Sequence, residues 1–480
     1  METEINGKKI EIKPHQSLID NQKGKPYLDN SDVAIIRDEN KCIGCGMCRT
    51  ACLEYNNLGI PEPQEVDGCL YFRPNGKMDF SDSDCTRCGQ CTLVCPTNCL
   101  AEKENIEEVK ADIADPNKIV VAQIAPSVRV SVSECFGLPP AQNMEGEIVA
   151  ALKKIGVDYV FDVNLGADFT TYEEAYDLLD RIKDKETPLF TSCCPARVKY
   201  IEDFHPELIP NITSVRSPQQ CLAVLIKTYF AKKINVNPEN ISVVSIMPCV
   251  AKKFESRREG EDKHSLSFDN AQDKPSAWDV DWVLTTRELV KLLKANKIDL
   301  AKIESMPFDS PLGEASGAGA IYGATGGVME SALRTAAYAA GKPLEKVDVQ
   351  EVRGMDDIKR VTFKIGEQEI RIAVAATLAN AEKIIDEIKN GEHYDYVEVM
   401  ACPGGCVGGG GQPKPATREV INKRREALYE IDKQKEIRTA HENPIVKEVY
   451  KEFLGCAGSE TAKKYLHTNY DKKQARICHI

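Results

Sequence analysis

The chain has 480 residues, of which 42% are hydrophobic and 28% are charged, as in an ordinary soluble globular protein. Its length predicts two to four domains, and its net charge of −12 argues against binding to nucleic acid or to an anionic membrane surface. No apolar run approaches the roughly 18–20 residues that cross a bilayer, and the first residues contain neither a hydrophobic export segment nor a twin arginine. We therefore expect a cytoplasmic protein without a membrane segment.

The chain contains 19 cysteines, which is unusual for a protein of this class. A disulfide scaffold is typical of short secreted chains, and this chain is long and shows no export segment. Thirteen of the cysteines fall in five tight motifs, and such spacing indicates metal binding. We expect the other six to be small buried residues or incidental thiols; they are Cys69, Cys99, Cys135, Cys221, Cys456 and Cys478.

Residues 1–36 are predicted to form an N-terminal β segment. Asn6-Gly7, flanked by Ile5 and Lys8, is a strong signal for a two-residue hairpin turn. The segment contains no cysteine, so we expect no cluster of its own there.

Residues 37–110 contain two cysteine runs of the same kind, Cys-x-x-Cys-x-x-Cys-x-x-x-Cys. Such runs bind 4Fe-4S cubes, and the fourth cysteine of each run binds the cube of the other. We assign one cluster to Cys42, Cys45, Cys48 and Cys95, and a second to Cys85, Cys88, Cys91 and Cys52. A zinc ribbon is the alternative, but it needs only pairs of cysteines. The segment is therefore predicted to be an α+β domain like a bacterial ferredoxin, through which electrons pass.

Residues 111–416 are predicted to form an α/β catalytic domain with two parallel-sheet halves. Three short apolar runs are typical of buried strands, namely Pro188–Phe190, Ile241–Ile246 and Tyr394–Val399. Each run precedes a cysteine loop, and open α/β sheets bind their ligands at the carboxyl ends of strands. Four thiolates from three strand ends can hold one iron–sulfur cluster, which leaves one cysteine over beside it.

Other elements of this domain are predicted from periodicity and capping signals. Ile119–Ile124 is a predicted strand that stops at Ala125-Pro126-Ser127, Glu145–Ile155 is a predicted helix, and Tyr159–Val163 is a further strand. Thr171-Tyr-Glu-Glu174 is a capping-box pattern that predicts a helix start. On that helix Glu174, Asp177 and Arg181 share one face, which is either a solvated charged face or a proton path.

Two glycine-rich stretches, 313–319 and 323–327, follow a second helix-start signal at Ser217-Pro218. They lack the Lys-Ser/Thr of a phosphate loop and the Rossmann fingerprint. We interpret them instead as places where the backbone approaches a buried cofactor, and the second stretch as the start of an alanine-rich helix. Residues 417–480 are charged and helical in pattern, and are predicted to form a tail that wraps the catalytic domain.

At its cysteine loops the chain closely resembles the iron-only (FeFe) hydrogenases, and the resemblance extends over nearly the whole chain from Cys42 onward. Its most specific motifs are the paired cubane runs, Thr-Ser-Cys-Cys-Pro at 191–195, Met-Pro-Cys-x-x-Lys-Lys-x-Glu at 247–255 and Met-Ala-Cys-Pro-Gly-Gly-Cys at 400–406. The resemblance implies an H cluster, a 4Fe-4S cube joined through a cysteine to a di-iron unit that carries CO, cyanide and an azadithiolate. By motif position it implies that the cube is held by Cys194, Cys249, Cys402 and Cys406, with Cys406 as the bridge.

The resemblance also implies which residues line the cofactor pocket. Lys252 and Ser127 match donors to the cyanide ligands, which are anionic acceptors that need buried donors. Further matching positions are Pro126, Gln219, Met247, Met400, Glu255 and Tyr322.

A proton relay is implied by the same matching of motifs. Cys193 matches the last proton donor to the azadithiolate amine, and Glu174 matches the next carboxylate. Asp177 and Arg181 match further members, and Thr213 matches a hydroxyl step. Asp177 stands where the family commonly has glutamate and Thr213 where it has serine, and both substitutions keep the chemistry.

The chain departs from the common pattern of the family at two positions near the cofactor. Ala196-Arg197 follows the first cysteine loop where Gly-Trp is usual, and Tyr322 stands where phenylalanine is common. The N-terminal segment resembles a ferredoxin-like fold that has lost the cysteines of a 2Fe-2S cluster.

The resemblance implies an enzyme that reversibly reduces protons to hydrogen, with electrons from a low-potential carrier such as ferredoxin. It implies maturation proteins that supply the di-iron unit, and it leaves open partner subunits, a homodimer or a place in a larger electron-bifurcating complex. Two alternatives remain, a slow-turnover hydrogen sensor and an iron–sulfur assembly factor without the di-iron unit. Sensors usually carry an added signalling domain, and assembly factors usually lose pocket residues such as Cys193, Lys252 and Glu255, all present here.

Overall fold

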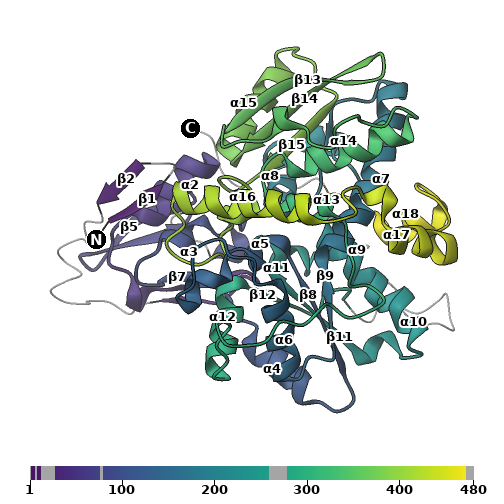
Figure 1. The fold of residues 1–480 in the computed structure, drawn as a ribbon. Coiled ribbons are helices and arrows are strands. Elements are labelled where there is room, and N and C mark those ends of the chain that lie inside the picture. The colour runs from purple at the N-terminus through teal and green to yellow at the C-terminus, as the bar shows by residue number, and fades with distance from the viewer. Residues whose placement is uncertain (1, 6–7, 12–26, 76–78, 259–277, 472–480) are drawn as a thin grey trace.

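Two four-stranded sheets organise the residues that the computed structural model describes, which are 2–5, 8–11, 27–75, 79–258 and 278–471 (Figure 1). The first sheet has the order β12-β11-β8-β9, and all neighbouring strands are parallel. Its strands are β8 (Ile119–Ile124), β9 (Tyr159–Asp162), β11 (Ile241–Met247) and β12 (Trp282–Thr285).

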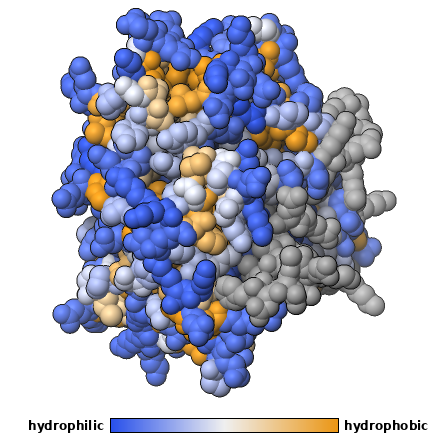
Figure 2. Space-filling view, turned by 90° about the vertical axis from the view of Figure 1, so that its right-hand side faces the viewer, coloured by the Kyte–Doolittle hydropathy of each residue, from blue (hydrophilic) through white to orange (hydrophobic). Residues whose placement is uncertain are grey.

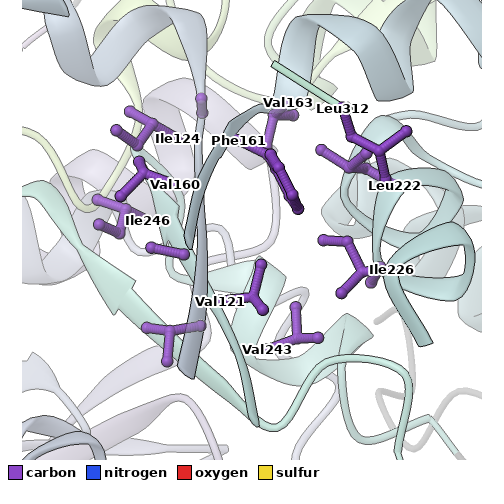
Figure 3. Close-up of a cluster of buried hydrophobic side chains, with 14 of the residues drawn as sticks. Val121, Ile124, Val160, Phe161, Val163, Leu222, Ile226, Val243, Ile246 and Leu312 are labelled. Carbon is purple, nitrogen blue, oxygen red and sulfur yellow. The ribbon is translucent and has the colours of Figure 1, made fainter. Parts of the chain in front are cut away.

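The first sheet is buried on both faces, which explains the near-continuous apolar sequence of its strands. Every residue of β11 is buried. Figure 3 shows side chains of the sheet, Val121, Phe161 and Val243 among them, facing Leu222 and Ile226 from the helix beside it. This apolar core fixes the ends of the first sheet's strands, one of which precedes the cysteine loop at Cys249.

The second sheet has the order β10-β15-β14-β13. Strands β10 (Leu189–Phe190), β15 (Tyr396–Met400) and β14 (Gln368–Ala376) are parallel, whereas β13 (Ile358–Ile365) pairs antiparallel with β14 at the edge. The prediction of an α/β domain with two parallel-sheet halves is confirmed, with one antiparallel edge strand added.

A smaller α+β region precedes the two sheets and contains the two cysteine runs. Its strands are β3 (Leu28–Asp29), β4 (Ile35–Asp38), β5 (Pro61–Val66), β6 (Cys69–Pro74) and β7 (Leu100–Glu102). Its helices α2 (Met47–Asn56) and α3 (Gln90–Val94) each begin after a glycine with positive φ. At the N-terminus β1 (Glu2–Ile5) pairs antiparallel with β2 (Lys8–Glu11), as the hairpin signal predicts, and the turn residues Asn6-Gly7 lie outside the described residues.

Helix α7 (Val163–Asp184) begins eight residues earlier than the capping-box pattern at Thr171 predicts, so that prediction is wrong. Asp162, at the end of β9, accepts a hydrogen bond from the backbone N–H of Asn164 and thereby caps the helix. Thr171 is buried in mid-helix, where its hydroxyl bonds to the hydroxyls of Tyr322 and Ser331. The early start matters because α7 then carries residues past both sheets.

Other predicted helices begin at the expected residues. Helix α6 is Glu145–Ile155, α9 is Pro218–Leu225 and continues as a π turn over Ile226–Phe230, and α14 is Gly327–Ala339. The other α-helices that the structure describes before residue 417 are α4 (Ile106–Ala114), α5 (Pro126–Arg129), α8 (Pro195–Phe204), α10 (Ala231–Lys233), α11 (Ala251–Glu255), α12 (Thr286–Ala295), α13 (Gly317–Ala320) and α15 (Leu378–Lys389).

The C-terminal residues form helices α16 (Arg418–Gln434), α17 (Pro444–Val449) and α18 (Glu460–Leu466). Figure 1 shows α16 running across the front of the molecule, in yellow-green, between the regions of the two sheets. It buries Leu428 and also an ionic contact, because Asp432 accepts hydrogen bonds from Arg334 of α14. The tail is therefore attached by buried charge as well as by apolar contact.

The surface is mostly polar. The face in Figure 2 is largely hydrophilic, with apolar side chains in small separate groups. Among the described residues, no helix combines the length and the apolar character needed to span a bilayer.

The ionic contact of α16 gives a test of the fold. The Arg334 side chain, 1% exposed, lies 2.8 Å from Asp432 Oδ2 and 2.6 Å from Glu330 Oε1, and both carboxylates are fully buried. We expect Arg334→Met to lower the free energy of unfolding by about 3–5 kcal/mol, because it leaves buried carboxylates short of a cation. Lys364→Met, which removes an exposed pair with Glu369, should cost less than about 1 kcal/mol. Denaturant unfolding followed by circular dichroism measures both, and equal losses would contradict the expectation.

Candidate functional site

A buried cavity lies between the two sheets, where the carboxyl ends of β8, β11 and β15 meet the start of α8. Its empty volume is about 720 Å³, including any part that opens to solvent. Its walls are mostly apolar, a common property of cofactor sites. The lining includes Cys193, Cys194, Cys249, Cys402 and Cys406 together with Pro126, Ser127, Gln219, Met247, Lys252, Tyr322 and Met400.

Four of the cavity cysteines come from three strand ends. Cys194 follows β10 and precedes the first residue of α8, Cys249 follows β11, and Cys402 and Cys406 follow β15. Burial and the nearby Cys194 thiolate together raise the pKa of Cys406 to about 12. Bound iron reverses this cost because coordination favours the thiolate. The geometry therefore offers four converging sulfur ligands at a site that disfavours four free thiolates.

Two glycines let the backbone close around the cavity. A Cβ at Gly323 would collide with the hydroxyl of Ser127, and a Cβ at Gly405, whose φ is +99°, would lie 2.6 Å from the backbone nitrogen of Thr325. Gly319, Gly323 and Gly405 all line the cavity. The glycine-rich stretches thus bring backbone up to the cavity, as their interpretation from the sequence expects.

Unsatisfied polar atoms show that the cavity suits a polar cofactor. The Ser127 hydroxyl and the Gln219 side-chain oxygen are buried without a hydrogen-bond partner in the part of the chain that the structure describes. Buried groups of this kind are normally paired. An apolar cavity with four thiols and spare hydrogen-bonding groups fits an iron–sulfur cofactor that carries anionic diatomic ligands.

Lys252 is held at the cavity wall by Glu255. Its Nζ donates to Glu255 Oε2 at 2.8 Å and to the backbone oxygen of Cys193 at 3.2 Å. Burial lowers the pKa of Lys252, but the Glu255 carboxylate outweighs burial and raises it overall. Glu255 also accepts hydrogen bonds from Ser217 and Gln219. The lysine therefore stays charged in a buried place and retains one further N–H for a cofactor.

The relay residues are partly connected. Thr213 Oγ1 donates to Asp177 Oδ2 at 2.6 Å, and Arg181 Nε donates to Asp177 Oδ1 at 3.0 Å. Glu174 lies one helical turn before Asp177 on α7. The side chains of Arg181 and Asp177 are 18% and 22% exposed, whereas Glu174 is fully buried. The set therefore runs from the surface inward along α7.

Glu174 and Cys193 form the inner end of the set. Glu174 Oε1 accepts a hydrogen bond from the Tyr396 hydroxyl at 2.7 Å, and its Oε2 has no partner among the described residues. Burial raises the pKa of Glu174 to about 8. Burial also raises the pKa of the Cys193 thiol, and the Glu174 carboxylate adds to that effect. Both groups therefore hold protons at neutral pH next to the cavity.

The cysteines of the smaller region lie in two groups. Cys42, Cys45, Cys48 and Cys95 line one pocket, whose empty volume is about 350 Å³. In the other group, burial and the nearby Cys88 and Cys85 thiolates together raise the pKa of Cys52 to about 12. Burial, Cys85 and Cys88 also raise the pKa of Cys91. The structure thus brings Cys95 to the first three cysteines of the first run, and Cys52 to those of the second.

The second group lies next to the main cavity. The Gln90 side chain donates to the backbone oxygen of Gly408 at 2.9 Å, and Thr92 donates to that of Gly410 at 3.2 Å. Gly89, with φ of +78°, lies so close to Gly410 that a Cβ would come within 3.2 Å of its Cα. Burial is the largest cause of the raised pKa of Cys402, and the Cys88 thiolate also raises it. Backbone contact thus joins the second cysteine group of the smaller region to the loop that follows the cavity cysteine Cys406.

Three features of the site were not predicted from the sequence. Cys99, expected to be a small buried residue or an incidental thiol, is buried, but it also lines the pocket of the first group and forms a hydrogen bond with Cys42. Its place four residues after Cys95 was the available signal. Tyr396 bonds to Glu174 from another sheet, and no spacing signal exists for that contact. Arg197 is buried, and the sequence of its helix contains no signal that predicts this burial. Cys478 lies outside the described residues.

Glu174 allows a test of this geometry by pH. A carboxyl whose pKa rises from 4.5 to about 8 on folding binds more protons when folded, so it costs stability as pH rises between these values. The quantity to compare is the free energy of unfolding of Glu174→Gln minus that of the parent. We expect this difference to be about 2–4 kcal/mol more favourable to the variant at pH 8 than at pH 5. Thermal unfolding of both proteins across this range measures the change. A difference that stays constant with pH would show that Glu174 is not buried in this way.

Comparisons with known proteins identify the segments. A family model for "Iron only hydrogenase large subunit, C-terminal domain" matches residues 118–410, one for "4Fe-4S dicluster domain" matches 41–99, and one for "Iron hydrogenase small subunit" matches 418–473. The last match covers α16 to α18, so the tail corresponds to a segment that has its own family model.

Similar proteins include both hydrogenases and assembly factors. The chain is 41% identical to NADP-reducing hydrogenase subunit HndD of Solidesulfovibrio fructosivorans, over 96% of this chain and 78% of that protein. It is 31% identical to cytosolic iron-sulfur assembly component 3 of Bos taurus, over 82% of this chain and 84% of that one. A solved FeFe-hydrogenase structure, described as showing stepwise H-cluster assembly, matches with a TM-score of 0.66 and 36% identity, over 77% of this chain and 99% of that one.

Proposed function

Because the chain belongs to the iron-only hydrogenase family, we propose that it reversibly reduces protons to molecular hydrogen at an H cluster in the main cavity. The observation that carries the proposal is the convergence of Cys194, Cys249, Cys402 and Cys406 on an apolar cavity with Cys193 beside them. When bound, the H cluster supplies iron that exchanges electrons and an amine that exchanges protons. The residues of the chain hold that group, exclude water and move protons to it.

Cys194, Cys249, Cys402 and Cys406 would hold the H cluster through their sulfurs. Lys252 and Ser127 would donate hydrogen bonds to its cyanide ligands, which is supported by the spare N–H of Lys252 and the unpartnered Ser127 hydroxyl. Glu255 positions Lys252, and Gln219 supports Glu255. Pro126, Met247, Met400 and Tyr322 complete the mostly apolar wall.

We assign the proton path to the set along α7. The Asp177 carboxylate takes up a proton near the surface, where Arg181 and Thr213 donate hydrogen bonds to it. Glu174 holds a proton inside the protein, as its pKa of about 8 favours. Cys193 holds the last proton at its Sγ atom, at the cavity wall. Each step moves a proton between groups of this chain.

Electrons would reach the cavity through two 4Fe-4S clusters. We assign one to Cys42, Cys45, Cys48 and Cys95 and the other to Cys52, Cys85, Cys88 and Cys91, which is supported by the two sulfur groups of the smaller region. The contact of Gln90 and Thr92 with the loop after Cys406 supports a position of the second cluster next to the H cluster. The donor would be ferredoxin or a similar low-potential carrier.

Further partners are part of the proposal. Maturation proteins would supply the di-iron unit. The similarity to a subunit of an NADP-reducing hydrogenase supports partner subunits that deliver electrons, and a homodimer is the alternative. The domain division that we propose is 1–36, 37–110, 111–416 and 417–480.

The cluster assignment can be tested by counting iron. We expect about twelve iron atoms per chain after reconstitution of the three cubes alone. Cys52→Ser and Cys194→Ser should each lose up to about four, because each removes one ligand of one cube. Cys456→Ser, at an exposed position, is the matched control and should lose none. Full iron content in Cys52→Ser would contradict the assignment of Cys52 as a cluster ligand.

The activity can be tested with reduced methyl viologen under anaerobic conditions after all clusters are loaded. We expect the parent to evolve hydrogen, and Cys193→Ala and Glu174→Gln each to slow evolution by about 10²–10⁴-fold, because each removes a proton donor. Thr213→Ser, which keeps the hydroxyl, should stay within a few-fold of the parent.

Infrared bands of CO and cyanide, recorded on the same samples, separate the alternatives. A parent with the bands but slow turnover would indicate a hydrogen sensor. A parent that cannot take up the di-iron unit would indicate an assembly factor, in line with the 31% identical relative. Equal rates in the parent and Cys193→Ala would show that the proton enters by another way.

A further inference from the structure

Arg197 is a buried cation without a partner in the described chain. It is 1% exposed, and Nε, Nη1 and Nη2 all lack hydrogen bonds. Other buried arginines are paired, since Arg129 contacts Asp162, Arg216 contacts Asp279 and Arg424 contacts Glu134. A buried guanidinium without an anion is strongly disfavoured. The described residues therefore do not supply the anion that compensates Arg197.

The position of Arg197 shows which anion that is. Cys194 directly precedes α8, and Arg197 is three residues further, on the first turn. Side chains on a helix lean toward its N-terminus, so the guanidinium is directed back over Cys194. Burial lowers the pKa of Arg197, and the groups that oppose burial are, in order, Cys194, Cys193, Tyr470 and Glu174. The strongest negative influence on the guanidinium is thus the sulfur of a proposed cube ligand.

Arg197 does not form part of the cavity lining, which in this region consists of Cys193, Cys194 and Pro195. An effect of Arg197 on a group bound in the cavity would therefore be through its charge and not through contact. The helix adds to the effect, because Cys194 lies at the N-terminal, positive end of α8, a helix of ten residues.

We propose that Arg197 is the counter-charge of the cube held by Cys194 and that it raises the reduction potential of that cube. A cube with four thiolate ligands is anionic and gains a further negative charge on reduction, so a fixed cation nearby favours the reduced state. This inference rests on the proposed function in one respect, the assignment of Cys194 as a ligand. It explains why an arginine is tolerated where the family usually has a tryptophan.

The test is an infrared redox titration of the fully loaded enzyme at one pH, because the CO and cyanide bands report on the H cluster and not on the other cubes. Arg197→Met removes the charge and keeps much of the length, whereas Arg197→Lys keeps the charge. At the midpoint potential of the parent, we expect the ratio of reduced to oxidised cube to fall about tenfold in Arg197→Met, which is a shift of 59 mV for a one-electron couple. Arg197→Lys should stay within about threefold of the parent. Arg360→Met, which removes a half-exposed arginine paired with Glu387, is the control and should not shift.

Three outcomes would overturn the proposal. An unchanged midpoint in Arg197→Met would show that its charge does not act on the cube. Equal shifts in Arg197→Met and Arg197→Lys would assign the effect to packing. A shift in Arg197→Met that disappears in a Glu174→Gln background would assign it to the carboxyl group instead. If Arg197→Met does not fold, Arg197→Gln takes its place. Absence of the bands in the parent would instead mean that the proposed function fails.

Discussion

The placement of four cysteines around one cavity is the constraint on which the rest of the structure depends. Cys194, Cys249, Cys402 and Cys406 come from positions up to about two hundred residues apart, and only the ends of strands in two sheets bring them together. Burial disfavours their charged form, so the site is costly without iron. The rigid, apolar sheets on either side hold the sulfurs in place despite that cost.

Charge around this point is arranged in pairs wherever the polypeptide can supply both members. Lys252 is paired with Glu255, and Arg334 of α14 is paired with Asp432 of the C-terminal tail. The second pair attaches the tail across the catalytic region, so the tail contributes to the fold that holds the cavity. Arg197 has no such partner among the described residues, and it lies three residues after a cysteine of the cavity. We therefore regard its partner as the cofactor.

Protons and electrons would approach the cavity from different elements. The proposed proton path follows α7 from Arg181 to Glu174 and ends at Cys193, whereas the proposed electron path ends at the Cys88 turn against the loop after Cys406. Hydrogen bonds serve the first path, and close backbone packing between Gly89 and Gly410 serves the second. Because the two proposed paths use different elements, a substitution in one path changes no residue of the other.

The sequence by itself determined the local elements and the sets of cysteines. Strand β8 and helix α6 have the predicted bounds, because continuous apolar runs and helical periodicity are local signals. The start of α7 was misjudged because Asp162, a strand-end residue, caps it before the pattern at Thr171. Only the tertiary structure decided the bond between Tyr396 and Glu174, the place of Cys99 beside Cys42 and the burial of Arg197. These depend on which distant segments pack together, and packing is a property of the folded chain that spacing along the sequence does not contain.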